Sequence, residues 1–279
     1  MKGACIMKTT KVISFFNIKG GIGKTTTTLL TAYQLVASNK NLKILLIDAD
    51  LQANLTQFIY KTFHEDRTLL DVVNNNLSAD EIIIKSPNSK YENIDLIPSD
   101  LTLCTLDESL TTKTSRETFF GRWFAKNKDI FNKYDYIFID LAPSYTLTSK
   151  NFLIATDSII IPITHGDIAS IRGAVLFKQL YIKDLQDIGL DDRPNIHLLL
   201  TKVESRKKEV LSIFDDYLNK FTGINKLLLH SKIKKTTVVE KSILYKLSIL
   251  DFLKEKRQSS KFKLDFSNLI DELKEKEIL

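Results

Sequence analysis

The chain has 279 residues, of which 43% are hydrophobic, and a net charge of +6. This composition excludes a disordered or fibrous protein and suffices for one large α/β domain with a substantial core. Cys5 and Cys104 are too few and too far apart for a disulfide framework, which favours a reducing, cytoplasmic setting. No apolar run reaches the roughly 18 residues of a membrane span, and residues 1–10 lack the apolar core of a signal peptide.

Apolar runs rich in β-branched residues alternate with longer amphipathic stretches. Continuous apolar runs of this length are typical of strands buried on both faces of a sheet. The predicted strands are 12–18, 43–47, 94–97, 136–139, 158–163, 196–200 and 227–229. The predicted helices include 24–37, 118–131, 169–185 and 207–221. This alternation predicts βαβ crossovers, and therefore an α/β fold with a single doubly wound, mainly parallel sheet and helices on both faces.

No internal repeat, low-complexity tract or Pro- or Ser-rich linker divides this pattern. We therefore expect residues 1–11 to form an N-terminal extension and residues 12–279 to form one domain that includes a basic C-terminal region. In doubly wound folds, ligands bind at the carboxyl ends of the strands. Functional residues are therefore expected directly after the predicted strands.

A glycine-rich loop connects the first predicted strand to the first predicted helix. Its residues are Lys19, Gly20, Gly21, Ile22, Gly23, Lys24, Thr25 and Thr26. Backbone N–H groups at a helix N-terminus point toward one spot where the helix dipole adds positive potential, so the loop predicts a phosphate site. Gly23, Lys24 and Thr25 match the end of the pattern GxxxxGK[ST], in which Lys reaches the β- and γ-phosphates and Thr ligates Mg²⁺. Ile18 stands where that pattern has its first Gly.

The loop resembles the deviant Walker A box of the ParA/MinD family of P-loop ATPases. The resemblance implies a P-loop NTPase domain, ATP and Mg²⁺ as cofactors, and nucleotide contacts from residues 19–26. It also implies that Lys19 reaches across a homodimer to the nucleotide of the partner subunit. On this basis Lys19 and Lys24 are candidate catalytic residues, and Thr25 is a candidate metal ligand.

Two predicted strands end in aspartate, the residue type that phosphoryl transfer uses for its metal and its attacking water. Strand 43–47 runs into the segment 48–54, DADLQAN, which is similar to the family's second box, usually written DxDPQGN. The resemblance implies that Asp48 orients the hydrolytic water and that Asp50 and Gln52 are supporting or switch residues. Leu51 and Ala53 replace the family's usual Pro and Gly.

The strand 136–139 ends in the segment 140–144, DLAPS, which resembles a Walker B motif. An isolated Asp at the end of a strand is more often a turn or cap residue than a ligand. With the glycine-rich loop upstream, we interpret Asp140 as the carboxylate on the metal side and Pro143 as a switch residue.

The charge is uneven along the chain. Residues 1–200 contain 22 basic and 22 acidic side chains, whereas residues 202–263 contain 16 basic and 7 acidic ones. Such a stretch is either a solvated helical surface or a face for a polyanion, and Lys and Arg bind phosphate backbones without reading sequence. On the second interpretation the candidate DNA-binding residues are Arg206, Lys207, Lys208, Lys232, Lys234, Lys235, Lys254, Lys256 and Arg257.

Members of the ParA/MinD family serve DNA partition, division-site placement on membranes, electron transfer and cluster assembly, and tyrosine kinase regulation, and the fold alone does not choose between them. The cysteine positions disfavour electron transfer, and the chain end has no tyrosine cluster. The acidic residues in 269–279 disfavour a helix that lies on anionic lipid. We therefore predict a cytoplasmic, nucleoid-associated partition ATPase whose ATP-bound homodimer binds double-stranded DNA non-specifically and releases it on hydrolysis.

The resemblance further implies Mg²⁺-dependent hydrolysis that is slow until a centromere-binding, ParB-like partner stimulates it. A MinD-like, membrane-associated positioning ATPase is the alternative, and a regulatory protein that senses ATP but barely hydrolyses it is another. With only residues 1–11 before the first strand, we do not expect this chain to bind an operator through an N-terminal helix-turn-helix.

Overall fold

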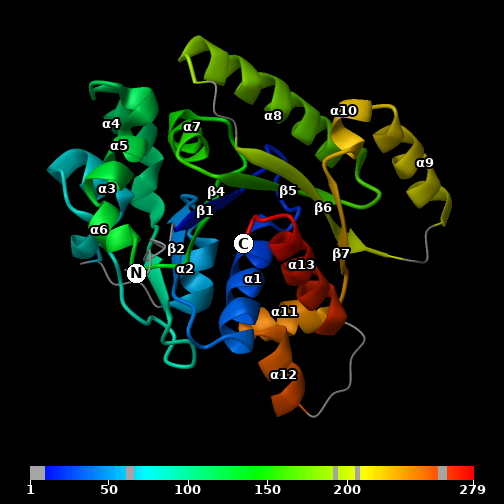
Figure 1. Ribbon diagram of the computed structural model, residues 1–279. Coiled ribbons are helices and arrows are strands. Elements are labelled where there is room, and N and C mark those ends of the chain that lie inside the picture. The colour runs from blue at the N-terminus through cyan, green and yellow to red at the C-terminus, as the bar shows by residue number, and fades with distance from the viewer. Residues whose placement is uncertain (1–9, 61–65, 191–193, 205–207, 257–262) are drawn as a thin grey trace, which may run out of the picture.

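A parallel sheet runs through the centre of the computed structural model, which describes residues 10–60, 66–190, 194–204, 208–256 and 263–279 (Figure 1). Residues 1–9 of the expected N-terminal extension lie outside the described residues. The strands are β1 (Lys11–Phe15), β2 (Ile44–Ala49), β3 (Ile94–Ile97), β4 (Tyr136–Leu141), β5 (Ser158–Thr164), β6 (Asn195–Val203) and β7 (Leu228–Lys234). Their order is β3-β2-β4-β1-β5-β6-β7, and every pairing between them is parallel.

Alternate residues of the central strands supply two separate hydrophobic cores, one on each face of the sheet. On β2, Leu45 and Ile47 belong to one core, whereas Ile44 and Leu46 belong to the other. All four side chains are fully buried. Because both faces are covered, each strand needs apolar residues at every position, which explains the continuous apolar runs in the sequence.

Helices cover both faces of the sheet (Figure 1). One layer contains α3 (Leu69–Asn75), α4 (Leu106–Thr111), α5 (Phe119–Lys126), α6 (Lys128–Phe131), α7 (Leu147–Ile154), α8 (Ile168–Asp187), α9 (Lys208–Asn219) and α10 (Thr222–Asn225). The other contains α1 (Lys24–Ser38), α2 (Asn54–Ile59), α11 (Thr237–Leu244), α12 (Ile249–Glu255) and α13 (Lys263–Glu275). Three short 3₁₀ helices are η1 (Ala79–Glu81), η2 (Leu101–Thr105) and η3 (Arg116–Thr118). The predicted fold class, a single doubly wound α/β sheet, is confirmed.

The prediction of one continuous helix over 118–131 is wrong, because the helix is interrupted at Asn127. The Asn127 side chain donates to the carbonyl of Trp123 at 2.9 Å and accepts from the N–H of Ala79 at 2.9 Å. A short amide side chain that bonds to nearby backbone competes with the helical hydrogen bonds. The long-range bond to Ala79 is a tertiary contact, which the local periodicity does not reveal.

The C-terminal helix α13 packs against α1 and β7. It buries Phe266, Leu269 and Leu273 in the core. Glu272 accepts hydrogen bonds from the backbone N–H groups of His230 and Ser231, each at 2.7 Å, and so ties α13 to β7. Among the residues that the structure describes, no helix is both long enough and apolar enough to cross a membrane.

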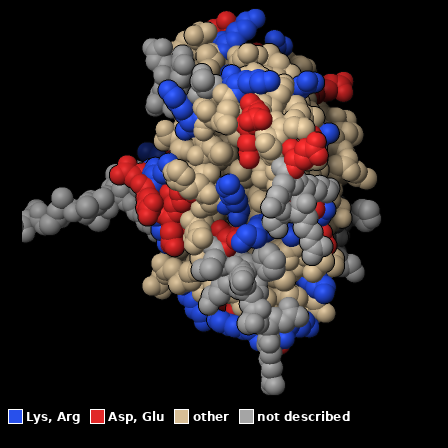
Figure 2. All heavy atoms as spheres, turned by 90° about the vertical axis from the view of Figure 1, so that its right-hand side faces the viewer, with Lys and Arg blue, Asp and Glu red and all other residues tan. Residues whose placement is uncertain are grey.

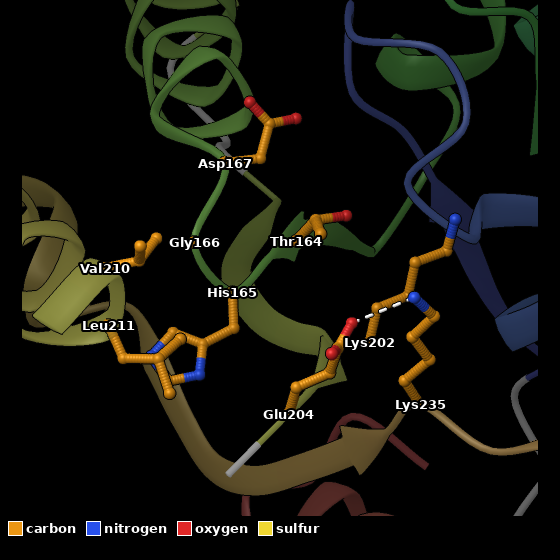
Figure 3. Close-up of a pocket in the computed structure, with 9 residues that line it drawn as sticks. All are labelled: Thr164, His165, Gly166, Asp167, Lys202, Glu204, Val210, Leu211 and Lys235. Atoms are coloured by element: carbon orange, nitrogen blue, oxygen red, sulfur yellow. Dashed lines mark hydrogen bonds and ion pairs between the residues drawn. The ribbon is translucent and has the colours of Figure 1, made fainter. Parts of the chain in front are cut away.

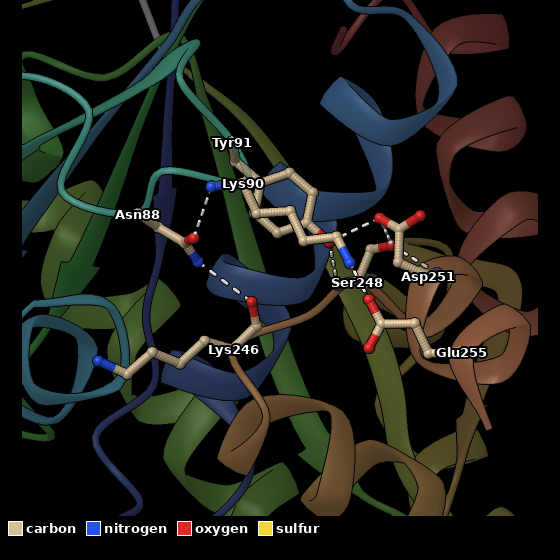
Figure 4. A network of polar contacts seen from close by, with 7 residues as sticks. All are labelled: Asn88, Lys90, Tyr91, Lys246, Ser248, Asp251 and Glu255. Carbon is tan, nitrogen blue, oxygen red and sulfur yellow. Dashed lines mark hydrogen bonds and ion pairs between the residues drawn. The ribbon is translucent and has the colours of Figure 1, made fainter.

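A polar network joins α12 to the loop before β3 (Figure 4). The Tyr91 hydroxyl donates to Asp251 at 2.7 Å and accepts from the N–H of Ser248 at 2.6 Å. Asn88 donates to the carbonyl of Lys246 at 3.1 Å, and Lys90 pairs with Glu255. These contacts connect α12 and the residues before it to the loop that precedes β3.

Candidate functional site

The glycine-rich loop links the end of β1 to the start of α1, as predicted, and two of its glycines have backbone conformations that favour glycine. Gly21 has φ 73° and Gly23 has φ 93°, values that cost a residue with a Cβ atom free energy. Gly23 is the N-cap of α1 and supplies no side-chain acceptor. The first N–H groups of the helix are therefore left for another acceptor.

The two lysines of the loop lie in different environments. Lys24 is buried, and its ammonium donates to the Lys19 carbonyl at 3.4 Å. Burial lowers the pKa of Lys24, and the nearby carboxylates of Asp140 and Asp50 oppose that shift. Lys19 is exposed, and its N–H donates to the side chain of Asn17 at 3.0 Å. Lys24 thus belongs to the interior of the site, and the side chain of Lys19 to its surface.

The two strand-end aspartates are neighbours, because Asp48 of β2 and Asp140 of β4 are register partners. Asp48 is fully buried and accepts bonds from the N–H of Asp50 at 3.1 Å, the N–H of Thr56 at 2.9 Å and the Thr56 hydroxyl at 2.8 Å. Burial raises the pKa of Asp48 to about 7, although the Thr56 bonds act in the opposite direction. Burial therefore favours the protonated form of Asp48 more than in an exposed carboxyl group.

Asp140 is buried as well, but neither of its oxygens has a hydrogen-bond partner among the described residues. Burial and the neighbouring Asp48 carboxylate raise the pKa of Asp140 well above its usual range, while the nearby Thr25 hydroxyl and Lys24 ammonium, neither of which makes a well-formed hydrogen bond to it, lower that pKa to a smaller extent. A buried carboxylate without partners is unfavourable unless a cation compensates it. Together with the hydroxyl of Thr25, these oxygens are the ligand type that Mg²⁺ prefers, so the residues fit that ion.

The second box forms a turn that leads into α2. Asp50 accepts from the N–H of Gln52 at 3.0 Å, and the Ser99 hydroxyl donates to the Asp50 carbonyl at 2.6 Å. Ala53 is the N-cap of α2 and has φ 51°, in the left-handed region. The family's usual Gly at this position is therefore explained by the backbone, and Ala53 keeps the loop shape at some cost in free energy.

One cleft brings the P-loop and the second box together, and the buried Asp48 and Asp140 are not among the residues that line it. It is lined by Gly20, Gly21, Gly23, Lys24, Thr25, Thr26, Asp50, Gln52, Asn54, Phe58, Pro143 and Lys202. Ile22 is buried, whereas Pro143 is exposed, and a Cβ atom placed on Gly20 would lie 3.8 Å from the Pro143 ring. Sequence reasoning did not predict the positions of Asn54, Phe58 or Lys202 here, and Lys202 comes from the distant strand β6.

The candidate DNA-binding lysines of the described segments are exposed, and several have acidic or aromatic neighbours. Lys234 pairs with Asp265 at 3.1 Å, and Lys235 pairs with Glu204 at 2.9 Å. The Lys256 ammonium lies 4.1 Å from the ring centre of Tyr245. Lys232 and Lys254 form no ion pair with another described residue.

The remaining candidates fall outside what the structure describes. Arg206, Lys207 and Arg257 lie outside the described residues, and so does the side chain of Lys208, the first residue of α9. Figure 2 shows the side of the molecule that carries β7, where basic and acidic side chains are interspersed. The predicted excess of positive charge is therefore partly compensated on this face.

Comparison with known proteins places this site in a family. A family model described as an AAA domain matches residues 10–197, which is more than half of the chain. The chain belongs to this family. The sporulation initiation inhibitor protein Soj of Bacillus subtilis is 34% identical, over 55% of this chain and 58% of Soj. The cell division protein PomZ of Myxococcus xanthus is 33% identical, over 58% of this chain and 48% of PomZ.

The matched segment thus spans about half the length of the curated relatives. A putative plasmid partition protein of Borrelia burgdorferi B31, solved with AMPPNP bound, superposes with a TM-score of 0.72. Its sequence is 24% identical, over 96% of this chain and 100% of that chain, so the likeness establishes the fold. Within the AAA-domain family, the chain is of the ParA type, as the resemblance predicted.

Proposed function

We propose that this protein is an ATP-dependent dimer switch that serves plasmid or chromosome partition. In the ATP state it binds double-stranded DNA non-specifically, and hydrolysis releases it. The observation that carries the proposal is the cleft in which the P-loop, Lys24 and Thr25 lie together with Asp50, next to the buried pair Asp48 and Asp140. This is the donor set that holding a nucleoside triphosphate and a divalent cation requires.

Within this proposal the residues have distinct roles. Residues 19–26 and the Lys24 ammonium bind the phosphates, and Thr25 and Asp140 hold Mg²⁺. When bound, Mg²⁺ neutralises charge that develops on the phosphate oxygens. Asp48 orients the attacking water, and its raised pKa allows it to take up a proton near neutral pH.

The same proposal assigns the exposed groups around the cleft. The exposed Lys19 reaches the nucleotide of the partner subunit in the homodimer. Asp50, Gln52 and Pro143 line the cleft and couple the nucleotide state to the dimer surface. A ParB-like, centromere-binding partner accelerates a slow basal ATPase, and the protein is located on the nucleoid in the cytoplasm.

DNA is favoured over a membrane as the surface on which the switch acts. The membrane alternative needs an amphipathic helix with a free apolar face. In α13 that face is occupied, because Phe266, Leu269 and Leu273 are buried against the rest of the domain. Lys232 and Lys254, in contrast, are exposed and available for phosphate contacts.

The test is co-sedimentation with random-sequence duplex DNA and with anionic liposomes, each with ATP, ADP or no nucleotide, across a salt series. We expect the protein to bind DNA in the presence of ATP but not with ADP or without nucleotide, and this binding should weaken as the salt concentration rises. The double variant Lys232→Ala with Lys254→Ala should weaken it about tenfold and reduce the salt slope by about 2. The control, Lys126→Ala with Lys128→Ala, removes the same charge from α5 and α6 at the other side of the molecule (Figure 1). Liposome binding without DNA binding would overturn the proposal in favour of membrane positioning.

A further inference from the structure

Two adjacent residues at the end of β6 hold two adjacent carbonyl groups of the P-loop. The Thr201 hydroxyl donates to the Ile22 carbonyl at 2.8 Å, and the Lys202 ammonium donates to the Gly21 carbonyl at 2.5 Å. Thr201 is buried, and Lys202 lines the cleft together with the P-loop glycines. The partners are 179 and 181 residues apart in the sequence, so these are contacts of the tertiary fold alone. We call Thr201 and Lys202 the β6 clamp.

The backbone of β6 departs from a regular strand at the β6 clamp. In a regular strand, neighbouring side chains point to opposite faces of the sheet and could not reach one loop together. Here the pairing of β6 with β7 shifts in register between Leu200 and Val203, and Lys202 has φ 52°. A left-handed conformation costs a Lys residue free energy, and such conformations persist mainly where surrounding contacts hold them. The irregularity brings both side chains onto the P-loop.

Because the peptide unit is planar, these two hydrogen bonds also fix the orientation of two backbone N–H groups. In a planar trans peptide, the C=O of one residue and the N–H of the next point in opposite directions. A fixed Gly21 carbonyl therefore orients the N–H of Ile22, and a fixed Ile22 carbonyl orients the N–H of Gly23. Neither N–H has an acceptor within the described part of the chain. Both are free for a phosphate oxygen, the ligand that such loops bind.

We propose that the β6 clamp positions the P-loop for phosphate binding, with Lys202 also adding positive charge at the rim of the cleft. Figure 3 shows the Lys202 side chain extending toward the P-loop, whereas the neighbouring Lys235 points to Glu204. Thr201 and Lys202 are positioning residues that act through Ile22 and Gly23. This inference rests on the proposed ATP binding and is independent of the proposed DNA step.

The test is the equilibrium affinity of the full chain for ATP and ADP without DNA, combined with thermal unfolding without nucleotide. Lys202→Met keeps most of the side-chain stem but removes the donor and the charge. We expect it to weaken ATP binding about tenfold, the size of one lost charge-assisted hydrogen bond, with little change in the unfolding midpoint. Lys202→Arg should restore most of the affinity, and Lys126→Met is the control for the loss of one distant charge.

Thr201→Val removes the hydroxyl, and with it the bond to the Ile22 carbonyl and a longer one to the Ile163 carbonyl at 3.2 Å, with no change in charge and little in size. It should weaken ATP binding about threefold to tenfold. If the β6 clamp acts through orientation, the Lys202→Met deficit persists in 0.5 M salt, where exposed charges are screened beyond about 4–5 Å. A deficit that vanishes in salt, or an affinity of both variants within twofold of the unchanged chain, would overturn the inference. If the unchanged chain itself binds no ATP, the proposed function fails, and the two failures are therefore distinguishable.

Discussion

The nucleotide cleft differs in its charges from the β7 edge, by which we mean the surface formed by Lys232, Lys234 and Lys235. Lys24 and Asp50 of the cleft and the adjoining Asp48 and Asp140 are buried, and Asp140 has no hydrogen-bond partner within the described residues, so an external cation and phosphates are needed to compensate these charges. At the β7 edge the lysines are exposed, and Lys234 and Lys235 already pair with Asp265 and Glu204. Buried charges respond strongly to single changes, whereas exposed pairs contribute little each. Variants of the cleft should therefore have larger effects than variants of the edge.

The largest effect on ATP affinity is expected for Lys24→Ala. The change removes the buried ammonium that faces the phosphate site, so ATP affinity should fall by about a hundredfold or more. Isothermal titration with ATP and Mg²⁺ measures this, with Lys126→Ala as a surface control. ATP binding by Lys24→Ala within tenfold of the unchanged chain would show that the cleft is not the phosphate site.

Asp48→Asn should separate hydrolysis from binding. Asparagine keeps the shape of the side chain and still accepts a bond from Thr56, but it takes up no proton. We expect turnover to fall about 10²–10⁴-fold, the usual contribution of an acid–base group, with ATP affinity nearly unchanged. Steady-state phosphate release measures the rate. An unchanged rate would favour the regulatory ATP sensor over the switch.

Asp140→Asn should stabilise the nucleotide-free protein in a pH-dependent way. The raised pKa of Asp140 means that the folded state keeps a proton which the unfolded state releases. Protonation of Asp140 therefore stabilises the folded state. This contribution is fully present below the pKa of Asp140 in the unfolded chain, about 3.9, and is lost as the pH rises through its pKa in the folded protein. At pH 8 the variant should therefore be more stable by about 1–3 kcal/mol, the size of a buried polar penalty.

Urea unfolding of both proteins at pH 5 and pH 8 tests this expectation for Asp140→Asn. The difference in the free energy of unfolding should grow from the lower to the higher pH. An equal difference at both pH values would indicate a packing effect in place of a buried charge. The variant should also lose the Mg²⁺ dependence of ATP binding if Asp140 is a metal-side carboxylate.

The smallest effect is expected for Ala53→Gly in the turn before α2. Because Ala53 has φ 51°, glycine relieves the left-handed strain but adds chain entropy to the unfolded state. The net gain should be about 0.5–1 kcal/mol. Ala125→Gly on the exposed face of α5 is the control and should destabilise by about 1 kcal/mol. Destabilisation by both substitutions in thermal unfolding would contradict the strain assigned to Ala53.

The same contrast explains which predictions from sequence succeeded. The P-loop is continuous in the chain, since residues 19–26 lie between one strand and one helix, and local chemistry is enough to recognise it. Asp48 and Asp140 are distant in sequence but follow parallel strands, whose carboxyl ends meet at one edge of the sheet. The helix break at Asn127 was missed, because its cause is a bond to Ala79, 48 residues earlier.

By itself, the sequence determined the doubly wound parallel sheet, the P-loop and the two strand-end aspartates, because apolar periodicity and short motifs act over a few residues. Tertiary structure alone decided that Thr201 and Lys202 meet the P-loop and that Asp48 is bonded while Asp140 is not. It also decided that the lysines of β7 are partly paired and that the apolar face of α13 is buried. These features depend on which distant side chains the fold brings together, because only the tertiary structure determines whether a charged group is buried and whether it is paired.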